Sequence, residues 1–392
     1  MNANRVEHFN GVKANDNYQR QTKIVATLGP ASWSEDGIGA LKKEGANVFR
    51  INCSHLDLEN APEQLPELVK RIRDVCGKSV EIMVDLQGPK LRIGRFASGD
   101  GQEKGVVILE SGQEFTFDSS SALGDLKRVH LPHPEIFERL NEGDDIFLND
   151  GQVHVRVASK DEGQLKCDVI HGGELSDRKG FNVKVDLPYK SLTGEDRGWV
   201  QIINDRNLDI NYVAQSFVET TSDVQDLSDI LEDPNITIIP KIERPKALDN
   251  FYEIVMHPRV FKVMVARGDL GIETDMNQLP MEQEDIIGLS NDIGKDVIVA
   301  THMMESMING SLPTRAELKD VSSAVKEGAW GVMLSGETAV GKHPSLVVNR
   351  VANIARSREM HMKGLFKSNA RQSFERAVRE PAFVAGLQHN AK

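Results

Sequence analysis

The chain of 392 residues has room for one barrel-sized domain and a smaller one. Hydrophobic residues make up 39% and charged residues 27%, which is ordinary for a globular protein and argues against global disorder. A net charge of −12 argues against a broad nucleic-acid-binding surface and against an acidic membrane surface, so we expect small-molecule partners.

The N-terminal segment, residues 1–21, is polar and lacks the apolar stretch of a signal peptide. No later apolar run approaches the roughly 20 residues of a membrane-spanning helix. The three cysteines, Cys53, Cys76 and Cys167, are too few for a disulfide framework and lack metal-ligand spacing. We therefore expect a cytoplasmic protein.

Short runs rich in β-branched residues then alternate with helical stretches, which is typical of βα units around a parallel sheet. The predicted strands are residues 23–28, 47–51, 80–86, 210–215, 236–239, 262–266, 297–300 and 331–334. Helices are predicted at 58–75, 281–293 and 314–327, the last opened by a capping box of Thr314 and Glu317. This order predicts a (β/α)8 TIM barrel formed by residues 22–94 and 188–356.

One segment interrupts the barrel pattern after the third strand. Residues 95–187 are rich in glycine and strand-like, and they contain no long amphipathic helix. We expect an inserted all-β domain, which at the functional rim of a barrel would suit a lid. The final segment, residues 357–392, is rich in basic residues and is interpreted as a solvated helical extension or a partner-binding arm.

Polar residues cluster where the predicted strands end, which is where barrel enzymes place their chemistry. A period of two puts Arg50, Asn52 and Ser54 on one side of the second strand. The ends of the other strands supply Asp85, Lys241 with Glu243, Arg267 with Asp269, Thr301 with His302, and Ser335 with Glu337.

Each of these pieces alone has a simpler interpretation, as a surface ion pair or a helix cap. Together they place two carboxylates, several cations and two hydroxyls at one rim. Glu243 and Asp269 supply the hard oxygen ligands that Mg²⁺ prefers. Arg50 and Lys241 would hold a phosphoryl group, Arg through a bidentate fork and Lys as a point charge.

A glycine-rich segment, residues 336–343, nearly matches a phosphate-binding P-loop. However, His343 stands where that loop needs Ser or Thr, and the carboxylate of Glu337 would repel phosphate. We therefore do not interpret it as a P-loop.

Six ordered motifs between residues 22 and 344 resemble those of the pyruvate kinase family. They are residues 22–32, 240–243 and 313–317, together with Arg50-Ile-Asn-Cys-Ser-His55, Met264-Val-Ala-Arg-Gly-Asp-Leu-Gly271 and Val332-Met-Leu-Ser-Gly-Glu-Thr-Ala339. The resemblance implies a barrel with an inserted β lid domain. It also implies transfer of a phosphoryl group from phosphoenolpyruvate to ADP, giving pyruvate and ATP, with Mg²⁺ or Mn²⁺ as cofactor.

The resemblance also implies roles for individual residues. Lys241 would stabilise the phosphoryl group in flight, Arg50 would bind phosphate, and Glu243 and Asp269 would hold the divalent metal. Backbone amides around Arg267 and Gly268 would hold the substrate carboxylate, close to Asp269 and Thr301. The remaining implied residues are the nucleotide-binding Asn52, His55, Arg92 and Lys179, and the proton-delivery residues Thr301, Ser335 and Glu337.

The sequence departs from the family pattern at several positions. Lys90 stands where most members have an acidic residue, beside a potassium site expected near Asn52, Ser54 and Asp85. Its ammonium would replace potassium, so K⁺ is not expected to be required. The family's C-terminal effector-binding domain has no counterpart after residue 356, so regulation through it is not expected, while a barrel-to-barrel homo-oligomer remains open. His302 and Leu56 also replace usual family residues near the site.

Two other functions remain open at this point. A Mg²⁺-dependent lyase or decarboxylase of pyruvate-type acids would keep Lys241, Glu243 and Asp269 but would not need Arg92 or Lys179. A non-catalytic regulatory homologue would not need to retain the metal carboxylates, the lysine and the threonine. Fold alone does not separate these functions.

Overall fold

The computed structural model describes residues 18–56, 61–98, 105–185, 189–365, 368 and 371–372. Eight parallel strands close into a barrel in the order β1-β16-β15-β14-β13-β12-β3-β2. Their bounds are β1 Lys23–Thr27, β2 Val48–Asn52, β3 Glu81–Asp85, β12 Tyr212–Gln215, β13 Thr237–Ile242, β14 Lys262–Ala266, β15 Asp296–Ala300 and β16 Gly331–Leu334. All eight strands agree with the predicted ones to within a few residues, which confirms the (β/α)8 barrel.

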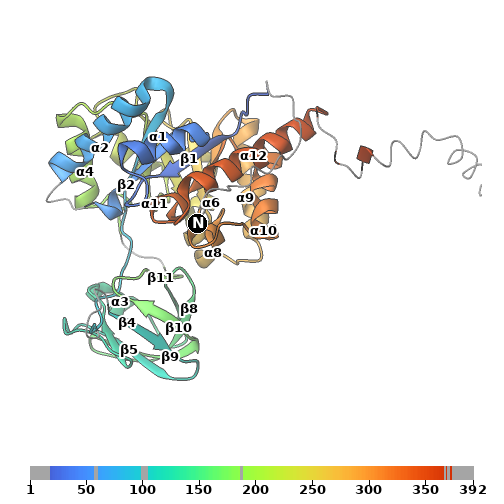
Figure 1. The fold of residues 1–392 in the computed structure, drawn as a ribbon. Coiled ribbons are helices and arrows are strands. Elements are labelled where there is room, and N and C mark those ends of the chain that lie inside the picture. The colour runs from blue at the N-terminus through green and yellow to red at the C-terminus, as the bar shows by residue number, and fades with distance from the viewer. Residues whose placement is uncertain are drawn as a thin grey trace, which may run out of the picture.

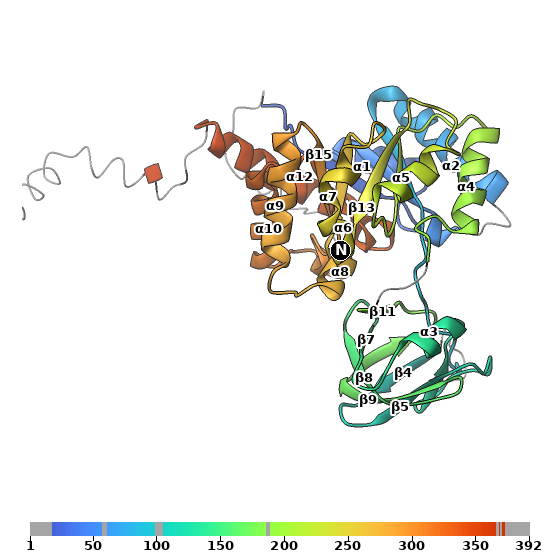
Figure 2. The same cartoon turned by 180° about the vertical axis from the view of Figure 1, so that it is seen from behind.

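Helices surround the barrel on its outer side (Figures 1 and 2). Those of the barrel are α1 Glu35–Glu44, α2 Ala61–Cys76, α4 Gly194–Asp205, α5 Thr221–Ser228, α6 Pro245–Asp249, α7 Phe251–Val255, α8 Arg267–Glu273, α9 Leu279–Asp292, α10 Arg315–Glu327, α11 Gly336–Ala339 and α12 Pro344–Met362. Three short 3-10 helices are η1 Cys53–His55, η2 Gly77–Ser79 and η3 Glu305–Ile308. Thr314 and Glu317 form the predicted capping box at the start of α10.

Two apolar layers hold the barrel together. The inner layer fills the barrel with side chains such as Val25, Met83, Met264 and Met333. The outer layer, which includes the fully buried Trp199 of α4, lies between the strands and the helices. Because both faces of each strand are buried, the strands are continuous apolar runs, and polar side chains concentrate at their carboxyl ends.

The inserted domain lies beside one end of the barrel, joined to it by extended segments (Figure 1). A six-stranded sheet has the order β11-β7-β8-β9-β5-β6, and β10 pairs with β4 in a second sheet. The bounds are β4 Val106–Leu109, β5 Glu114–Asp118, β6 Arg128–His130, α3 Pro134–Arg139, β7 Asp145–Leu148, β8 Val153–Asp161, β9 Gln164–His171, β10 Gly173–Ser176 and β11 Phe181–Val183. This arrangement confirms an inserted β domain after the third barrel strand.

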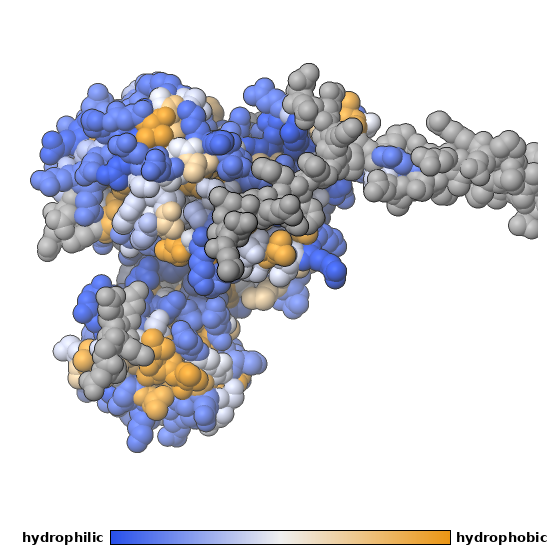
Figure 3. All heavy atoms as spheres, viewed as in Figure 1, coloured by the Kyte–Doolittle hydropathy of each residue, from blue (hydrophilic) through white to orange (hydrophobic). Residues whose placement is uncertain are grey.

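Apolar side chains gather in a patch on the face of the inserted domain that Figure 3 shows. Val106 and Ile108 on β4, together with Leu123 and Leu126, are exposed large hydrophobic residues of this domain. Among the described residues, no helix combines the length and apolar character that crossing a bilayer requires.

The structure shifts three predicted limits. β13 continues to Ile242, because Lys241 and Ile242 still pair with β14. Leu91 and Ile93 already belong to the apolar core of the inserted domain, ahead of the limit drawn at residue 95. α12 passes residue 357 and ends at Met362, while most of the basic tail and residues 1–17 lie outside the described residues.

Candidate active site

A cavity of about 480 Å³ lies at the carboxyl ends of the barrel strands, between the barrel and the inserted domain. It brings together most of the residues singled out from the sequence: Arg50, Asn52, Ser54, His55, Asp85, Lys90, Arg92, Lys179, Lys241, Glu243, Asp269, Thr301 and Ser335. These residues come from strand ends, from the link to the inserted domain and from that domain itself. Most residues that line this cavity are therefore predicted by their position at the carboxyl end of a barrel strand.

Lys241 lies among acceptors near the centre of this wall. Its ammonium donates to Ser216 Oγ at 2.7 Å and lies 2.9 Å from Glu243 Oε1 and 3.5 Å from Asp85 Oδ1. Burial alone would lower the pKa of Lys241, but the charges of Asp85 and Glu243 outweigh it and raise the pKa. Lys241 is therefore a fixed positive charge that faces the cavity.

Arg50 and Asp85 form a buried ion pair at the ends of β2 and β3, with Nε 2.6 Å from Oδ2. The guanidinium also donates to Thr27 Oγ1 at 3.0 Å. Burial would raise the pKa of Asp85, but Arg50 and Lys241 outweigh this effect and lower it. Asp85 thus holds two cations side by side at the cavity.

Glu243 and Asp269 follow neighbouring strands and influence each other's ionisation. Burial raises the pKa of Glu243, and the nearby Asp269 raises it further against the opposing charge of Lys241. The pKa of Asp269 is lowered, because Lys90 and Lys241 outweigh its burial. Two close carboxylates whose charges repel form a donor set that suits a divalent cation.

Lys90 lines the same cavity as Asn52, Ser54 and Asp85, and its ion-pair partners are two other carboxylates. Its ammonium lies 3.0 Å from Asp269 Oδ1 and 3.9 Å from Asp150 Oδ1. The reason is electrostatic: Asp85 already holds Arg50 and Lys241, so the less compensated Asp269 attracts the ammonium.

Thr301 and Ser335 line the cavity from the ends of β15 and β16. Thr301 adopts a φ of 69°, which is rare for a β-branched residue and marks local backbone strain. Its hydroxyl donates to Ala300 O at 2.6 Å and accepts from Gly268 N at 2.8 Å. Ser335 Oγ is buried and has no hydrogen-bond partner among the described residues, as is expected of a group that meets a ligand.

Three of the expected site residues have other partners. The guanidinium of Arg267 donates to Thr301 O at 2.7 Å and to Asp320 Oδ1 at 2.8 Å, so its side chain does not line the cavity. The backbone amide of Gly268 donates its hydrogen bond to the Thr301 hydroxyl, as described above. Glu337 is 1% exposed and accepts from the backbone amides of Met304 and Ser335 at 2.9 and 2.7 Å.

These bonds show how the structure places Arg267, Gly268 and Glu337, whose expected roles in binding and proton delivery stay predictions. Arg267 and Gly268 fasten the strained turn that carries Thr301, and Glu337 fixes the backbone of Ser335. The two amide donors fix the position of the Glu337 carboxylate behind Ser335. The period of two also fails after Asn52, because Cys53–His55 form η1 and Ser54 is not part of the strand.

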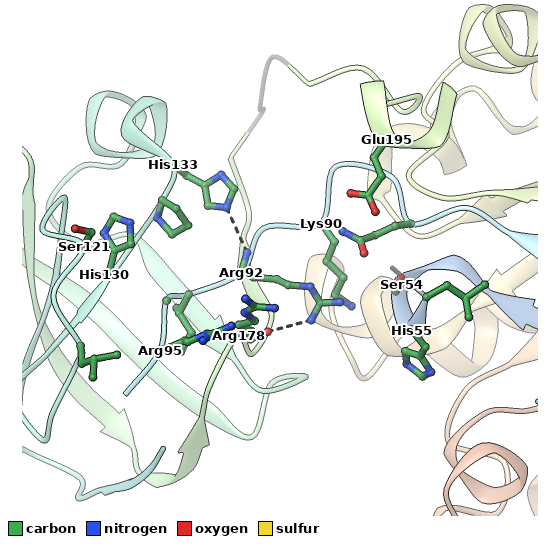
Figure 4. A pocket seen from close by; sticks show the side chains of 16 residues that line it. Ser54, His55, Lys90, Arg92, Arg95, Ser121, His130, His133, Arg178 and Glu195 are labelled. Carbon is green, nitrogen blue, oxygen red and sulfur yellow. Dashed lines mark hydrogen bonds between the residues drawn. The ribbon is translucent and has the colours of Figure 1, made fainter. Parts of the chain in front are cut away.

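A second cavity of about 740 Å³ adjoins the first and shares Ser54, His55, Gln87, Lys90 and Arg92 with it. Figure 4 shows Arg95 and Arg178 side by side on the inserted domain, while the side chain of Arg92 extends toward Lys90 and the barrel. Arg92 donates from NH1 to Arg178 O at 3.0 Å. Four lysine and arginine side chains face a single carboxylate, Glu195, so this cavity is basic in an otherwise acidic protein.

Sequence reasoning missed several residues of the wall, including Thr27, Asp150, Ser216 and Phe217. Ser216 accepts from Lys241, and the Phe217 amide donates to Glu243 Oε2 at 2.7 Å. Ser216 and Phe217 follow β12, so inspecting the end of the fourth strand would have found them. Asp150 lies in the turn between β7 and β8 of the inserted domain, and nothing in the local sequence pointed to it.

No group of three or more His, Cys, Asp or Glu side chains is placed to hold a metal within the part of the chain that the structure describes. A site with two carboxylates suits Mg²⁺, which commonly takes its other ligands from substrate and water. The barrel is closed, and a polar cavity lies at the carboxyl ends of its strands, next to the inserted domain. This arrangement defines a (β/α)8-barrel enzyme.

Comparison with known proteins gives the family. The family model for the barrel domain of pyruvate kinase matches residues 19–348. The chain is 42% identical over 337 residues to a pyruvate kinase of Methylorubrum extorquens, covering 86% of this chain and 68% of the relative. It is 38% identical over 348 residues to one of Staphylococcus haemolyticus, covering 87% and 57%, and 36% identical over 343 residues to one of Corynebacterium glutamicum, covering 87% and 70%. The chain belongs to the pyruvate kinase family of phosphotransferases, and it spans between 57% and 70% of the length of these relatives.

Proposed function

We propose that this chain transfers a phosphoryl group from phosphoenolpyruvate to ADP and releases pyruvate and ATP. The observation that carries the proposal is the position of Lys241. This fixed cation shares one cavity with Arg50 and with the carboxylates of Glu243 and Asp269. Arg92 and Lys179 line the same cavity. Such a transfer depends mainly on positioning and on charge neutralisation, and this wall offers both. Arg50 would bind the phosphate, and Lys241 would stabilise the phosphoryl group as it moves.

Glu243 and Asp269 are the residues that would hold Mg²⁺ or Mn²⁺. When bound, the ion would neutralise charge on the transferring group. The chain prepares this site with the Phe217 amide, which fixes Glu243, and with Lys90, which balances Asp269. The hard oxygen donors of both residues fit either cation.

The enolate left after transfer needs a proton at its terminal carbon. Thr301 and Ser335 are the hydroxyls that line the cavity for this step, and we propose a relay through them or through water. Thr301 is held by its strained backbone and by the Gly268 amide, and Ser335 Oγ is unpartnered and free to bond a substrate or water. Glu337 then acts by fixing the backbone of Ser335.

The nucleotide would enter through the larger, basic cavity of Figure 4. Arg92 and His55 line both cavities, while Lys179 and Asn52 line the smaller, catalytic one beside them. Burial, followed by the charges of Arg50 and Arg92, lowers the pKa of His55, which favours the neutral imidazole beside the phosphates. Arg92 and Lys179 favour the kinase over a lyase, which would not need them.

We propose further that K⁺ is not required, because the Lys90 ammonium already stands in the cavity. A cytoplasmic location belongs to the same proposal, and the three buried free cysteines suit a reducing compartment. Barrel-to-barrel association into a homo-oligomer is also proposed.

A direct test is a coupled assay for pyruvate from phosphoenolpyruvate with Mg²⁺, run with and without ADP. The proposal expects turnover only when ADP is present. Turnover without ADP, or with oxaloacetate alone, would instead establish a lyase. No turnover under any condition would favour the non-catalytic homologue.

A further inference from the structure

Asn182 lies in the middle of β11, the strand of the inserted domain that packs against α8 of the barrel. Its neighbours Phe181 and Val183 are buried and apolar, and Asn182 itself is 5% exposed. A buried asparagine between two apolar residues costs free energy unless its amide is satisfied. Its partners therefore indicate why an amide stands there.

The amide of Asn182 faces two carboxylates of one helix. Its Nδ2 donates to Asp269 Oδ1 at 3.3 Å. The Asn182 amide also acts on the Glu273 carboxyl, which is 9% exposed, and favours its charged form against the effect of burial on the pKa. Asp269 and Glu273 are four residues apart in α8 and so lie on one face of that helix. A primary amide has two N–H donors, enough to serve both carboxylates.

The carbonyl oxygen of the Asn182 side chain indicates that the donor contacts fix the orientation of the amide. Asn182 Oδ1 is buried and has no hydrogen-bond partner among the described residues. Leaving this carbonyl oxygen without a donor is unfavourable. The orientation of the amide is therefore fixed by the hydrogen bond that its Nδ2 donates to Asp269. The amide nitrogen points to the carboxylates because their negative charge favours a donor over the carbonyl oxygen.

Two further contacts place the amide at the junction of the domains. Lys184, next along from β11, donates to Thr274 O just beyond α8 at 2.9 Å. Lys90, in the link that leads into the inserted domain, bonds to Asp269 as well. Asn182 and Glu273 line a small junction cavity together with Lys90, Phe217 and Arg244. Docking of β11 on α8 therefore determines which donors Asp269 meets.

We propose that Asn182 is a positioning residue through which the docked inserted domain orients the Asp269 carboxylate and so sets the affinity for the divalent cation. The inference rests on the proposed function, in which Asp269 is a metal ligand. Partners of metal ligands contribute because they fix ligand orientation, and their loss commonly weakens metal binding by about 10- to 100-fold. Separation of the inserted domain from α8 would remove this donor from Asp269, so domain docking and metal binding favour each other.

The test measures Mn²⁺ binding to the full chain by the electron paramagnetic resonance signal of free Mn²⁺. Asn182→Leu removes the amide with little change in volume and is expected to weaken Mn²⁺ binding about tenfold. Lys184→Met is the matched control, because it loses a contact of β11 with the barrel but removes no donor from Asp269, and we expect less than a threefold change. The Mn²⁺ concentration for half-maximal activity should rise about tenfold in Asn182→Leu, while kcat at saturating Mn²⁺ stays within threefold.

Each outcome has a distinct meaning. Mn²⁺ affinity of Asn182→Leu within twofold of the wild type overturns the inference, and so does an equal loss in Lys184→Met. A fall in kcat without a shift in half-saturation also overturns it, since that indicates general damage. If Asn182→Leu does not fold, Asn182→Ala is measured with the same limits. Wild-type-like binding by Asp269→Asn would instead remove Asp269 as a metal ligand, and the inference would fail together with that part of the proposed function.

Discussion

Lys90 and Asp269 form an ion pair across the cavity, with the ammonium 3.0 Å from Oδ1 and 3.2 Å from Oδ2. Lys90 precedes the inserted domain, and Asp269 lies in the first turn of α8. Burial would lower the pKa of Lys90, but Asp269 and Asp150 outweigh it and raise the pKa, so the residue stays charged. The pair therefore gives the candidate metal site a permanent cation that belongs to the chain.

This permanent cation predicts activity without potassium. Pyruvate formation in tetramethylammonium chloride should equal that in potassium chloride at the same ionic strength. Lys90→Glu places an added negative charge beside Asp269 and should lose most activity in tetramethylammonium. Strong activation of the wild type by K⁺, measured in the coupled assay, would refute the role given to Lys90.

Lys241→Met should lower phosphoryl transfer by at least about 10³-fold, because preorganised charge at the transferring group is removed. Exchange of the C3 protons of pyruvate with solvent should suffer less, since Thr301 and Ser335 remain in place. Nuclear magnetic resonance follows the exchange and the coupled assay follows the transfer. Equal loss of both activities would contradict this division of labour.

Asp85→Asn should destabilise the fold, because Arg50 and Lys241 would then face each other without a shared carboxylate. Breaking a buried ion pair by removing one partner costs about 3 kcal/mol or more. The more exposed Asp209, which pairs with Arg73 and Lys78, provides a control. Asp209→Asn should cost less than about 1 kcal/mol. Urea unfolding at pH 7 compares the two, and similar losses would count against the importance of Asp85.

Glu273 predicts a pH dependence of stability. Burial raises its pKa to about 7, from an ordinary value of 4.5. Between these pH values the folded chain binds the extra proton, so its stability decreases as the pH rises from about 4.5 to 7 and then levels off. Glu273→Gln lacks this loss. In urea unfolding with EDTA, its advantage over the wild type should grow by about 3 kcal/mol across the window. A constant difference from pH 5 to pH 8 would contradict the buried acid.

The barrel strands could be predicted to within a few residues, since the alternation of apolar strands and helices depends on local sequence. The position of each polar residue at a strand end also follows from local sequence, which is why Arg50, Lys241 and Glu243 meet as expected. What a side chain bonds to depends on distant segments. Glu337 is held by Met304, and Lys90 turns to Asp269 because Arg50 and Lys241 occupy Asp85.

The same limit explains why residues of the inserted domain were harder to assign. Asp150 lines the catalytic cavity and Asn182 bonds to Asp269 because the inserted domain docks on the barrel through β11 and α8, which are far apart in the chain. No periodic pattern reports such docking. Lys179, three residues before Asn182, is a candidate from the sequence, but the contact of Asn182 with Asp269 becomes evident only with the fold.

The central claim is transfer of a phosphoryl group at the cavity of Lys241, Glu243 and Asp269. Phosphorus nuclear magnetic resonance of the full chain with phosphoenolpyruvate, ADP and Mg²⁺ tests it most directly. The account predicts that the γ-phosphate signal of ATP grows in step with the loss of phosphoenolpyruvate, and that EDTA or Glu243→Gln abolishes this transfer. Loss of phosphoenolpyruvate to orthophosphate, or transfer that survives both changes, would contradict the account.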